Sequence, residues 1–279
     1  MWKTVTIIGV GLIGGSIGLA LRERKLAERV IGVGRRAASL RKAKRLGIAT
    51  ATTLDVEEGV SEADLVVVAT PIAQIVDQVC AAAPACRPGT LITDAGSTKG
   101  TIVASLNGQL PEAIRFVGSH PLAGSEKSGP EAATADLFEG RVVVVTPSRT
   151  TRKGAAEDAA DFWSALGATV FMMSPEQHDA ALATTSHLPH LLASLLAGAT
   201  PRADLPLTAT GWQDTTRIAA GDPELWTQIF LDNKRNVLKS LARFEKTMQR
   251  AKAAIERGDA KALDRLLTEA KAIRDAVGS

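Results

Sequence analysis

The first 173 residues alternate between short apolar runs and longer segments with helical periodicity. Runs rich in Val and Ile predict strands buried on both faces of a parallel sheet, and the amphipathic segments between them predict helices that cover such a sheet. Beyond residue 173 no strand-like run remains, and Ala- and Leu-rich helical periods continue. We therefore expect an α/β domain with a doubly wound, mostly parallel sheet over residues 1–173, followed by an all-helical domain over residues 174–279. The predicted strands are residues 5–8, 29–33, 64–69, 89–93, 115–117, 141–147 and 168–173.

The turn after the first predicted strand is built from glycines. Residues 9–14 read GVGLIG, the pattern GxGxxG, and a predicted helix follows at residues 16–24. In such a turn the first glycine bends the chain, the second lets the backbone approach a pyrophosphate, and the third packs helix against strand. The phosphates bind at the start of the helix. This pattern therefore predicts a dinucleotide-binding Rossmann domain. Its expected cofactor contacts here are Gly9, Gly11, Leu12, Ile13 and Gly14.

The same stretch resembles a secretory signal, because Lys3 precedes an apolar run from residue 5 to residue 21. Five glycines interrupt this run, and no small-residue cleavage site follows before Arg22. The run is also too broken by glycine to span a membrane. Strand, turn and helix is the better interpretation, and we expect no membrane association.

Composition narrows the class of protein further. A chain of 279 residues with 45% hydrophobic and 23% charged residues is typical of a globular protein with a sizeable core. The net charge of +3 is small and no Lys/Arg block is present, so we expect no nucleic-acid partner. Cys80 and Cys86 do not form a CxxC motif, and neither a disulfide framework nor a metal site is indicated. We expect a cytoplasmic protein.

The end of the second predicted strand bears on the choice of dinucleotide. NAD-binding domains carry an acidic residue there for the adenosine ribose. This chain has Gly34, Arg35 and Arg36 instead. Guanidinium groups bind phosphate through paired hydrogen bonds, so the two arginines favour the 2′-phosphate of NADP over NAD. The alternative is that they begin a basic, solvated helix at residues 40–46.

A histidine follows another predicted strand, in a segment of turn-forming residues. His120 lies between Gly118 and Pro121, just after the strand at residues 115–117. In an open α/β sheet, ligands bind beyond the carboxyl ends of the strands. A lone histidine in a polar loop is more often a surface residue. The strand that ends near Thr93 also opens onto small polar residues, which makes a shared site at this edge more plausible.

The helical half has two features of interest. His187 and His190 are three residues apart and share a helix face, and Pro189 should kink this helix. Two histidines without a nearby carboxylate or cysteine are poor evidence for a metal. Further on, Arg217 lies three residues after Asp214. The spacing does not decide between a clamp for a substrate carboxylate and an ion-pair partner of Asp214.

Several motifs together, in this order, resemble the prephenate/arogenate (cyclohexadienyl) dehydrogenases of tyrosine biosynthesis. The resemblance runs from residue 5 to about residue 245, and its His-Pro and Asp-Thr-Thr-Arg segments are specific to that family. It implies a Rossmann domain followed by a helical domain through which two chains form a homodimer. The motifs are GVGLIGGS at residues 9–16, ATP at 69–71, DAGSTKG at 94–100, GSHPLAGSEKSG at 118–129, SHLPH at 186–190 and GWQDTTR at 211–217.

The resemblance implies a reaction and a role for each matching residue. The reaction is the oxidative decarboxylation of prephenate or arogenate, with hydride transfer to NADP or NAD. His120 would accept the proton of the ring hydroxyl, and Ser97 would orient this hydroxyl or His120. Arg217 would bind a substrate carboxylate. The other implied substrate contacts are Asp214, Glu126, His187, His190 and Trp226, and the other implied cofactor contacts are Thr70, Pro71 and Ser97.

Two alternatives remain open. A 3-hydroxyacid dehydrogenase combines the same domain types but uses a catalytic lysine in its helical domain, and this chain has no lysine between Lys153 and Lys234. A non-catalytic NADP-binding sensor would leave His120 without a catalytic role. The sequence does not separate prephenate from arogenate, because the two differ only in a keto or an amino group.

Overall fold

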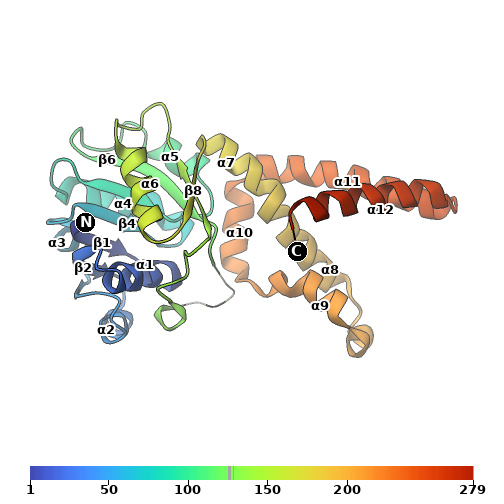
Figure 1. Cartoon of the computed structure of the whole chain (residues 1–279), viewed down its shortest axis with the longest axis horizontal. Helices are drawn as coiled ribbons and strands as arrows, with labels where there is room; N and C mark the ends of the chain where they lie inside the picture. Colours follow the sequence, from blue (N-terminus) through green and yellow to red (C-terminus); the bar gives the residue numbers. More distant parts are fainter. Residues whose placement is uncertain (125–126, 128, 279) are drawn as a thin grey trace. The chain divides into compact units, whose positions relative to one another are not determined.

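The apolar runs of the first half form a single sheet in the computed structural model, which describes residues 1–124, 127 and 129–278 (Figure 1). The order of the eight described strands is β3-β2-β1-β4-β5-β6-β7-β8. All neighbours are parallel except β6 and β7. The strands are β1 (Trp2–Ile8), β2 (Ala27–Val33), β3 (Ala51–Thr53), β4 (Leu65–Val68), β5 (Leu91–Asp94), β6 (Arg115–Pro121), β7 (Val142–Thr146) and β8 (Thr169–Met172).

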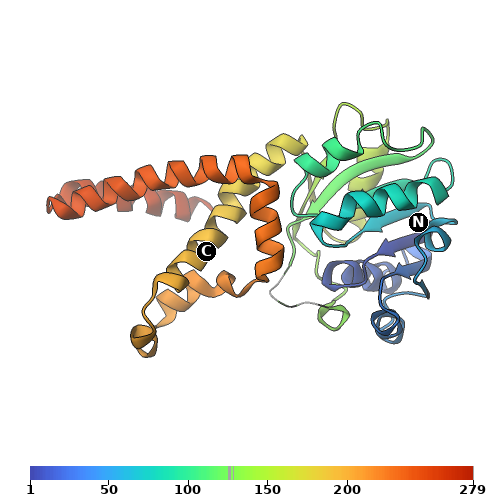
Figure 2. The same ribbon diagram turned by 180° about the vertical axis from the view of Figure 1, so that it is seen from behind.

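Helices cover both faces of this sheet because its strands are apolar on both sides. Buried residues of α1 and α6 form one core with the strands, and those of α3, α4 and α5 form a second core on the other face. Figure 1 shows α1 and α6 in front of the sheet, and Figure 2 shows α4 and α5 from behind. These helices are α1 (Leu12–Glu23), α2 (Ala37–Arg45), α3 (Val56–Val60), α4 (Ile72–Ala82), α5 (Gly100–Leu106) and α6 (Ala155–Ala165).

The strand order places the candidate site residues along one edge. The chain turns to opposite sides after β1 and after β4, and ligands bind at such a switch point in doubly wound sheets. Because β1, β4, β5 and β6 are parallel neighbours, their carboxyl ends meet at the same edge. The turns after β1, β4 and β5 carry the glycine motif, Thr70 and Ser97, and His120 lies near the end of β6 itself.

The structure corrects several sequence-based expectations. Residues 118–121, predicted as turns, continue strand β6, because they pair with β7 after the pairing with β5 has ended at Val117. Helix α1 begins at Leu12 rather than residue 16, and α2 begins at Ala37 rather than residue 40. The short elements β3, α3 and α5 were not predicted.

All described elements after β8 are helical, as expected, and those up to Asn233 belong to the same compact unit as the sheet. Helix α7 begins with a capping box between Ser174 and Gln177. Before Pro189 the helix widens into one π-helical turn, Ala183–His187, because proline has no N–H to donate. The remaining helices are α7 (Pro175–Leu182), α8 (Leu188–Ala199), α9 (Thr210–Thr216) and α10 (Pro223–Asp232), with 3₁₀ turns at Ala83–Ala85, Pro130–Ala132, Arg202–Leu207 and Arg217–Ala220.

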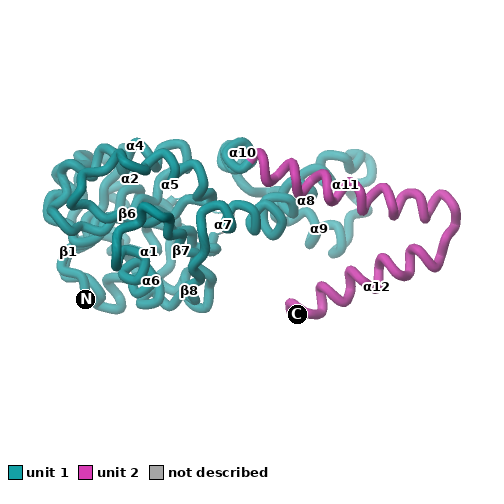
Figure 3. Tube along the Cα trace, turned by 90° about the horizontal axis from the view of Figure 1, so that it is seen from above, with its two compact units in different colours: residues 1–233 teal, residues 234–279 magenta. Residues whose placement is uncertain are grey.

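Residues 234–279 are a second compact unit, coloured magenta in Figure 3. It consists of a helical hairpin, α11 (Lys234–Glu256) and α12 (Ala260–Ala276). Gly258, at φ +63°, makes the turn that ends α11, and the Asp259 carboxylate caps α12 by accepting a hydrogen bond from the Ala262 N–H. Both helices lie in the part of the chain for which helical periods predict helices.

Candidate active site

The glycine turn after β1 has the geometry of a dinucleotide cradle. Gly9 has φ +101°, and a Cβ there would lie 2.6 Å from the Ala69 carbonyl oxygen. A Cβ on Gly14 would lie 1.9 Å from the Gly9 oxygen. Neither position can hold a side chain without moving the backbone. A Cβ on Gly11, in contrast, would meet no atom within 4 Å, so the chain leaves open space in front of α1.

The start of α1 has free hydrogen-bond donors. Gly11 is the N-cap, no side chain caps the helix, and its first turn holds no acidic residue. Its N–H groups are therefore available to phosphate oxygens. Leu12 and Ile13 are half-buried there. Thr70 and Pro71 follow β4 beside Gly9, and the buried Thr70 hydroxyl has no hydrogen-bond partner in the described part of the chain. These features fit a bound dinucleotide.

Arg35 and Arg36 lie in the turn between β2 and α2, and both side chains are exposed. Across residues 1–124, 127 and 129–278, no carboxylate pairs with either guanidinium. The two cations are therefore accessible at the strand end where the adenosine ribose binds in Rossmann domains.

His120 lies near the end of β6, and only 8% of it is exposed. Its Nδ1 is 2.9 Å from Nε2 of His178, a residue of α7 that we did not single out from the sequence. The two rings meet edge to face, with centroids 5.1 Å apart. No described group forms a hydrogen bond with Nε2 of His120, so this nitrogen is the one available to a substrate.

His178 connects His120 to a buried carboxylate. Its Nδ1 is 2.8 Å from Oδ1 of Asp179. The two oxygens of this carboxylate also accept hydrogen bonds from the backbone N–H groups of Lys99 and Gly100, and both hydrogen bonds are 2.8 Å long. Asp179 therefore fastens α7 to the start of α5. The result is a continuous chain of contacts from His120 through His178 to Asp179.

The surroundings of these groups shift their pKa values. Burial, with the nearby His178, Lys99 and His187, holds the pKa of His120 well below its usual range. Burial alone would raise the pKa of Asp179, but hydrogen bonds from His178, Lys99 and Gly100 outweigh it and lower that pKa. At neutral pH the site thus contains an uncharged His120 and an ionised Asp179.

A buried ion pair contacts the backbone of β6 next to His120. Lys99 and Asp94 are both fully buried, and their side chains form a salt bridge. The Lys99 ammonium also donates to the Ser119 carbonyl over 2.8 Å, directly before His120. Burial lowers the pKa of Lys99, and the Asp94 charge opposes this shift. Ser97 is half-buried in the loop between the two, and its hydroxyl makes no hydrogen bond to any described residue, His120 included.

His187 and Asn233 extend the network. The Asn233 side-chain amide donates to the Asp179 carbonyl oxygen over 2.7 Å and lies 3.2 Å from Nδ1 of His187. His187 is 1% exposed, and burial lowers its pKa to about 4. It is therefore neutral at physiological pH. Because Asn233 donates to its Nδ1, the His187 proton is on Nε2.

His190 and Trp226 stack on each other, with ring centroids 3.5 Å apart and planes 13° from parallel. The His187 ring meets the same indole edge to face at 6.3 Å. Gly221 makes the stack possible, since a Cβ there would lie 2.6 Å from Nε1 of Trp226. Burial lowers the pKa of His190. His187, His190 and Trp226 thus lie together, as the predicted shared face requires.

Of the two alternatives that the spacing of Asp214 and Arg217 left open, the ion pair is not present among the described residues. Asp214 is in α9 and Arg217 in the following 3₁₀ turn, and both are exposed. Glu126, the remaining predicted substrate contact, lies outside the described residues.

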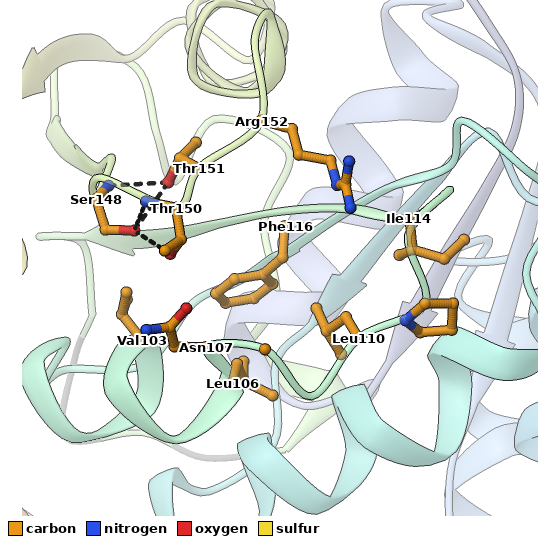
Figure 4. A pocket seen from close by; sticks show the side chains of 13 residues that line it. Val103, Leu106, Asn107, Leu110, Ile114, Phe116, Ser148, Thr150, Thr151 and Arg152 are labelled. Carbon is orange, nitrogen blue, oxygen red and sulfur yellow. Dashed lines mark hydrogen bonds between the residues drawn. The ribbon is translucent and has the colours of Figure 1, made fainter.

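His178, Asp179, Asn233 and Lys99 were missed by the sequence reasoning. One signal was available: the chain has only four histidines, and all four are buried in this one region. A pocket outside this region, of about 280 Å³, lies between α5 and the loop before α6 (Figure 4). Phe116, Leu106 and Leu110 form its apolar wall, and Arg152 lies at its margin. It contains none of the predicted site residues.

Two family models match the chain, one after the other. Residues 17–172 match "Prephenate dehydrogenase, nucleotide-binding domain", and residues 174–269 match "Prephenate dehydrogenase, dimerization domain". The chain belongs to the prephenate dehydrogenase family. The described residues include no helix suited to span a membrane and no cluster of three or more His, Cys, Asp or Glu that could hold a metal.

Individual relatives of this family are similar over nearly the whole chain. The prephenate dehydrogenase of Bacillus subtilis is 36% identical, over 99% of this chain and 76% of the relative. The cyclohexadienyl dehydrogenase of Zymomonas mobilis is 34% identical, over 93% of this chain and 90% of the relative. Among solved structures, the prephenate dehydrogenase from A. aeolicus in complex with hydroxyphenyl propionate and NAD⁺ superposes with a TM-score of 0.90 at 34% identity, covering 99% and 98% of the two chains.

Proposed function

We propose that this chain catalyses the oxidative decarboxylation of prephenate, arogenate or both, with NADP as the preferred acceptor of the hydride. The observation that carries the proposal is the buried, neutral His120 at the sheet edge that also holds the dinucleotide cradle. Family membership and the printed activities of the relatives support the reaction.

The cofactor would be held by residues that fit it. The N–H groups at Gly11, Leu12 and Ile13 would bind the pyrophosphate, and Arg35 and Arg36 would bind a 2′-phosphate. Thr70, Pro71 and Ser97 would lie near the nicotinamide end, since they follow the neighbouring strands. When bound, the nicotinamide ring accepts the hydride.

His120 is the general base in this proposal. Its Nε2 accepts the proton of the ring hydroxyl as the hydride leaves the ring carbon that bears this hydroxyl. The bond to the ring carboxylate breaks, its electrons enter the ring, and carbon dioxide departs. The phenolate oxygen then regains the proton from His120. Ser97 is in the adjacent loop and would orient the hydroxyl group.

The helical residues would bind the rest of the substrate. Arg217 is exposed and unpaired among the described residues, so its guanidinium is available to a substrate carboxylate. His187 carries its proton on Nε2 and can donate to the substrate side chain. His190 and Trp226 would pack against this side chain, and Asp214 and Glu126 are the remaining proposed substrate contacts.

We further propose a homodimer formed through the helical domain at residues 174–279, in a cytoplasmic enzyme. The name of the matching dimerization model supports the dimer. Both cysteines are free, which suits a reducing compartment.

A turnover assay with prephenate and arogenate, each with NADP and with NAD, tests the proposal. We expect reduction of NADP with at least one substrate, accompanied by release of carbon dioxide and formation of a phenol. Absence of turnover in all four combinations would remove the catalytic proposal, and faster turnover with NAD would remove the cofactor preference alone.

A further inference from the structure

The contacts from Asp179 to His120 determine where each proton lies. An ionised carboxylate only accepts hydrogen bonds. Asp179 is ionised and lies 2.8 Å from Nδ1 of His178, so Nδ1 of His178 carries a proton. When His178 is uncharged, its lone pair is on Nε2, which faces Nδ1 of His120 at 2.9 Å. In that state His120 donates from Nδ1, and its own lone pair is on Nε2.

The other tautomer of His120 does not fit an uncharged His178. With its proton on Nε2, His120 would present a lone pair from Nδ1 to the lone pair of His178, and no hydrogen bond would form. His120 and His178 are 8% and 0% exposed, so water cannot readily replace the lost hydrogen bond. Such a His120 could not accept a substrate proton at Nε2.

Three hydrogen bonds, two to its carboxylate and one to its backbone carbonyl, hold Asp179 in place. The N–H groups of Lys99 and Gly100 donate to its two oxygens at the start of α5. Asn233 donates to the Asp179 backbone carbonyl from the end of α10. A carboxylate fixed in this way also fixes the plane and position of the His178 ring.

We propose that His178 is a positioning residue for the reaction: hydrogen-bonded to Asp179, it holds His120 in the tautomer with a free lone pair on Nε2. This inference rests on the proposed role of His120 as the base. His178 contacts His120 and Asp179 rather than the substrate, and therefore acts through His120. The same hydrogen bond supports His120 once it has accepted the proton, since the imidazolium still donates from Nδ1.

Two substitutions separate this role from a merely structural one. In His178→Asn, the side-chain amide nitrogen lies near the place of Nδ1 and can still donate to Asp179, but nothing accepts from His120. In His178→Gln, the side-chain carbonyl oxygen lies near the place of Nε2 and can accept from His120, but the donor to Asp179 is lost. Each variant thus retains one of the two contacts.

We expect kcat to fall by about 10- to 100-fold in His178→Asn, because His120 is no longer held in its productive tautomer. In His178→Gln we expect kcat to remain within about 5-fold of the wild-type value. The KM for NADP should be unchanged in both. Thermal stability should follow the opposite order, with His178→Gln the less stable variant, since it leaves Asp179 without its partner. Equal losses of kcat in the two variants, or normal kcat in His178→Asn, would overturn the proposal.

The tautomer itself can be observed. The chain has only four histidines, so ¹⁵N-histidine labelling of the full-length protein gives few signals. Long-range ¹H–¹⁵N correlation should show the His120 proton on Nδ1 in the wild type and in His178→Gln. A wild-type proton on Nε2 would overturn the proposal even if the kinetics agreed. If His120→Asn keeps normal turnover, the assignment of the base has failed; if only the His178 variants behave normally, the positioning role alone has failed.

Discussion

At the scale of single residues, the site depends on burial that keeps histidines neutral. His120 and His187 are both buried within one hydrogen-bonded network, and both have lowered pKa values. A base must be unprotonated before it can accept a proton. The apolar surroundings supply this condition at neutral pH, and the contacts at Nδ1 of each ring leave Nε2 as the nitrogen that would face a substrate in the proposed reaction.

Replacement of His120 tests its role directly. Asparagine can still form a hydrogen bond but cannot accept the proton, so His120→Asn should lower kcat by roughly 10²- to 10⁴-fold. Binding of NADP, measured by fluorescence titration, should change little. Because burial lowers the pKa of His120, wild-type kcat/KM should stay constant well below pH 6.5 and fall only in more acidic solution. Near-normal turnover of the variant would exclude His120 as the base.

His187 should make the folded state sensitive to acid. Its pKa is about 4 in the folded protein and near 6.5 in the unfolded chain, so the unfolded chain binds more protons between these values. The stability that uncharged His187 contributes should therefore be fully present above pH 6.5 and be lost as the pH drops towards 4. At about pH 5 the loss from His187 is on the order of 2 kcal/mol. Urea denaturation at about pH 5 and pH 7.5 measures the free energy of unfolding at each pH. The difference between the two values should be smaller for His187→Gln than for wild type; an equal difference would contradict this role of His187.

Arg217 should affect substrate binding rather than folding. It is exposed and forms no ion pair with Asp214 in the described ranges. Arg217→Ala should lower kcat/KM by an amount equivalent to at least about 2 kcal/mol of free energy, mainly through a higher KM. Arg217→Lys should have a smaller effect. Arg202→Ala, another exposed arginine of the helical region, is the matched control. A lower melting temperature with unchanged KM would return Arg217 to a structural role.

At the scale of elements, the turn between β2 and α2 should select the cofactor. Replacing Arg35 and Arg36 with alanine removes charge-assisted hydrogen bonds worth about 1.5–3 kcal/mol each. The double variant should therefore have a much higher KM for NADP and an almost unchanged KM for NAD. Arg41→Ala, an exposed arginine in α2 itself, should leave both values unchanged. A wild type that prefers NAD, or a double variant without effect on NADP, would show that the turn does not bind the 2′-phosphate.

Much of the sheet could be predicted because its strands carry strong local signals. The run before Gly9 is apolar and ends in a glycine turn, so β1 and α1 follow from sequence alone. In contrast, β3 has three residues and α3 has five, too few for a periodic pattern. The extension of β6 through His120 depends on pairing with β7, more than twenty residues away. No local pattern contains that information.

The site was predicted where chemistry coincides with a strand end and missed where it depends on packing. His120 and Ser97 follow strands that the sequence identifies. His178, in contrast, is a polar residue in a helix, and only the approach of α7 to β6 brings it to His120. No local sequence pattern marks Asn233 either, since its partners Asp179 and His187 are about fifty residues away.

At the scale of the whole molecule, apolar side chains remain exposed on the helical elements. Leu195 and Leu196 on α8 are 56% and 43% exposed, and Leu267 and Ile273 on α12 are 64% and 73% exposed. Exposed apolar residues that recur along helices are typical of surfaces that bind another protein. The matching dimerization model extends over these helices. Both findings support the proposed homodimer.

The final prediction concerns this association. Wild-type protein should elute from size-exclusion chromatography with light scattering at about twice the 29.2 kDa of the chain. Ile273→Glu places a charge on an apolar position, and its burial in a dimer would be costly because the carboxylate would have no partner. This variant should be largely monomeric at micromolar concentration. Ala272→Glu adds the same charge at the neighbouring exposed position, away from the large apolar side chains, and should remain dimeric. If the two variants dissociate equally, the effect comes from charge alone; if neither does, the apolar stripe of α12 lies outside the interface.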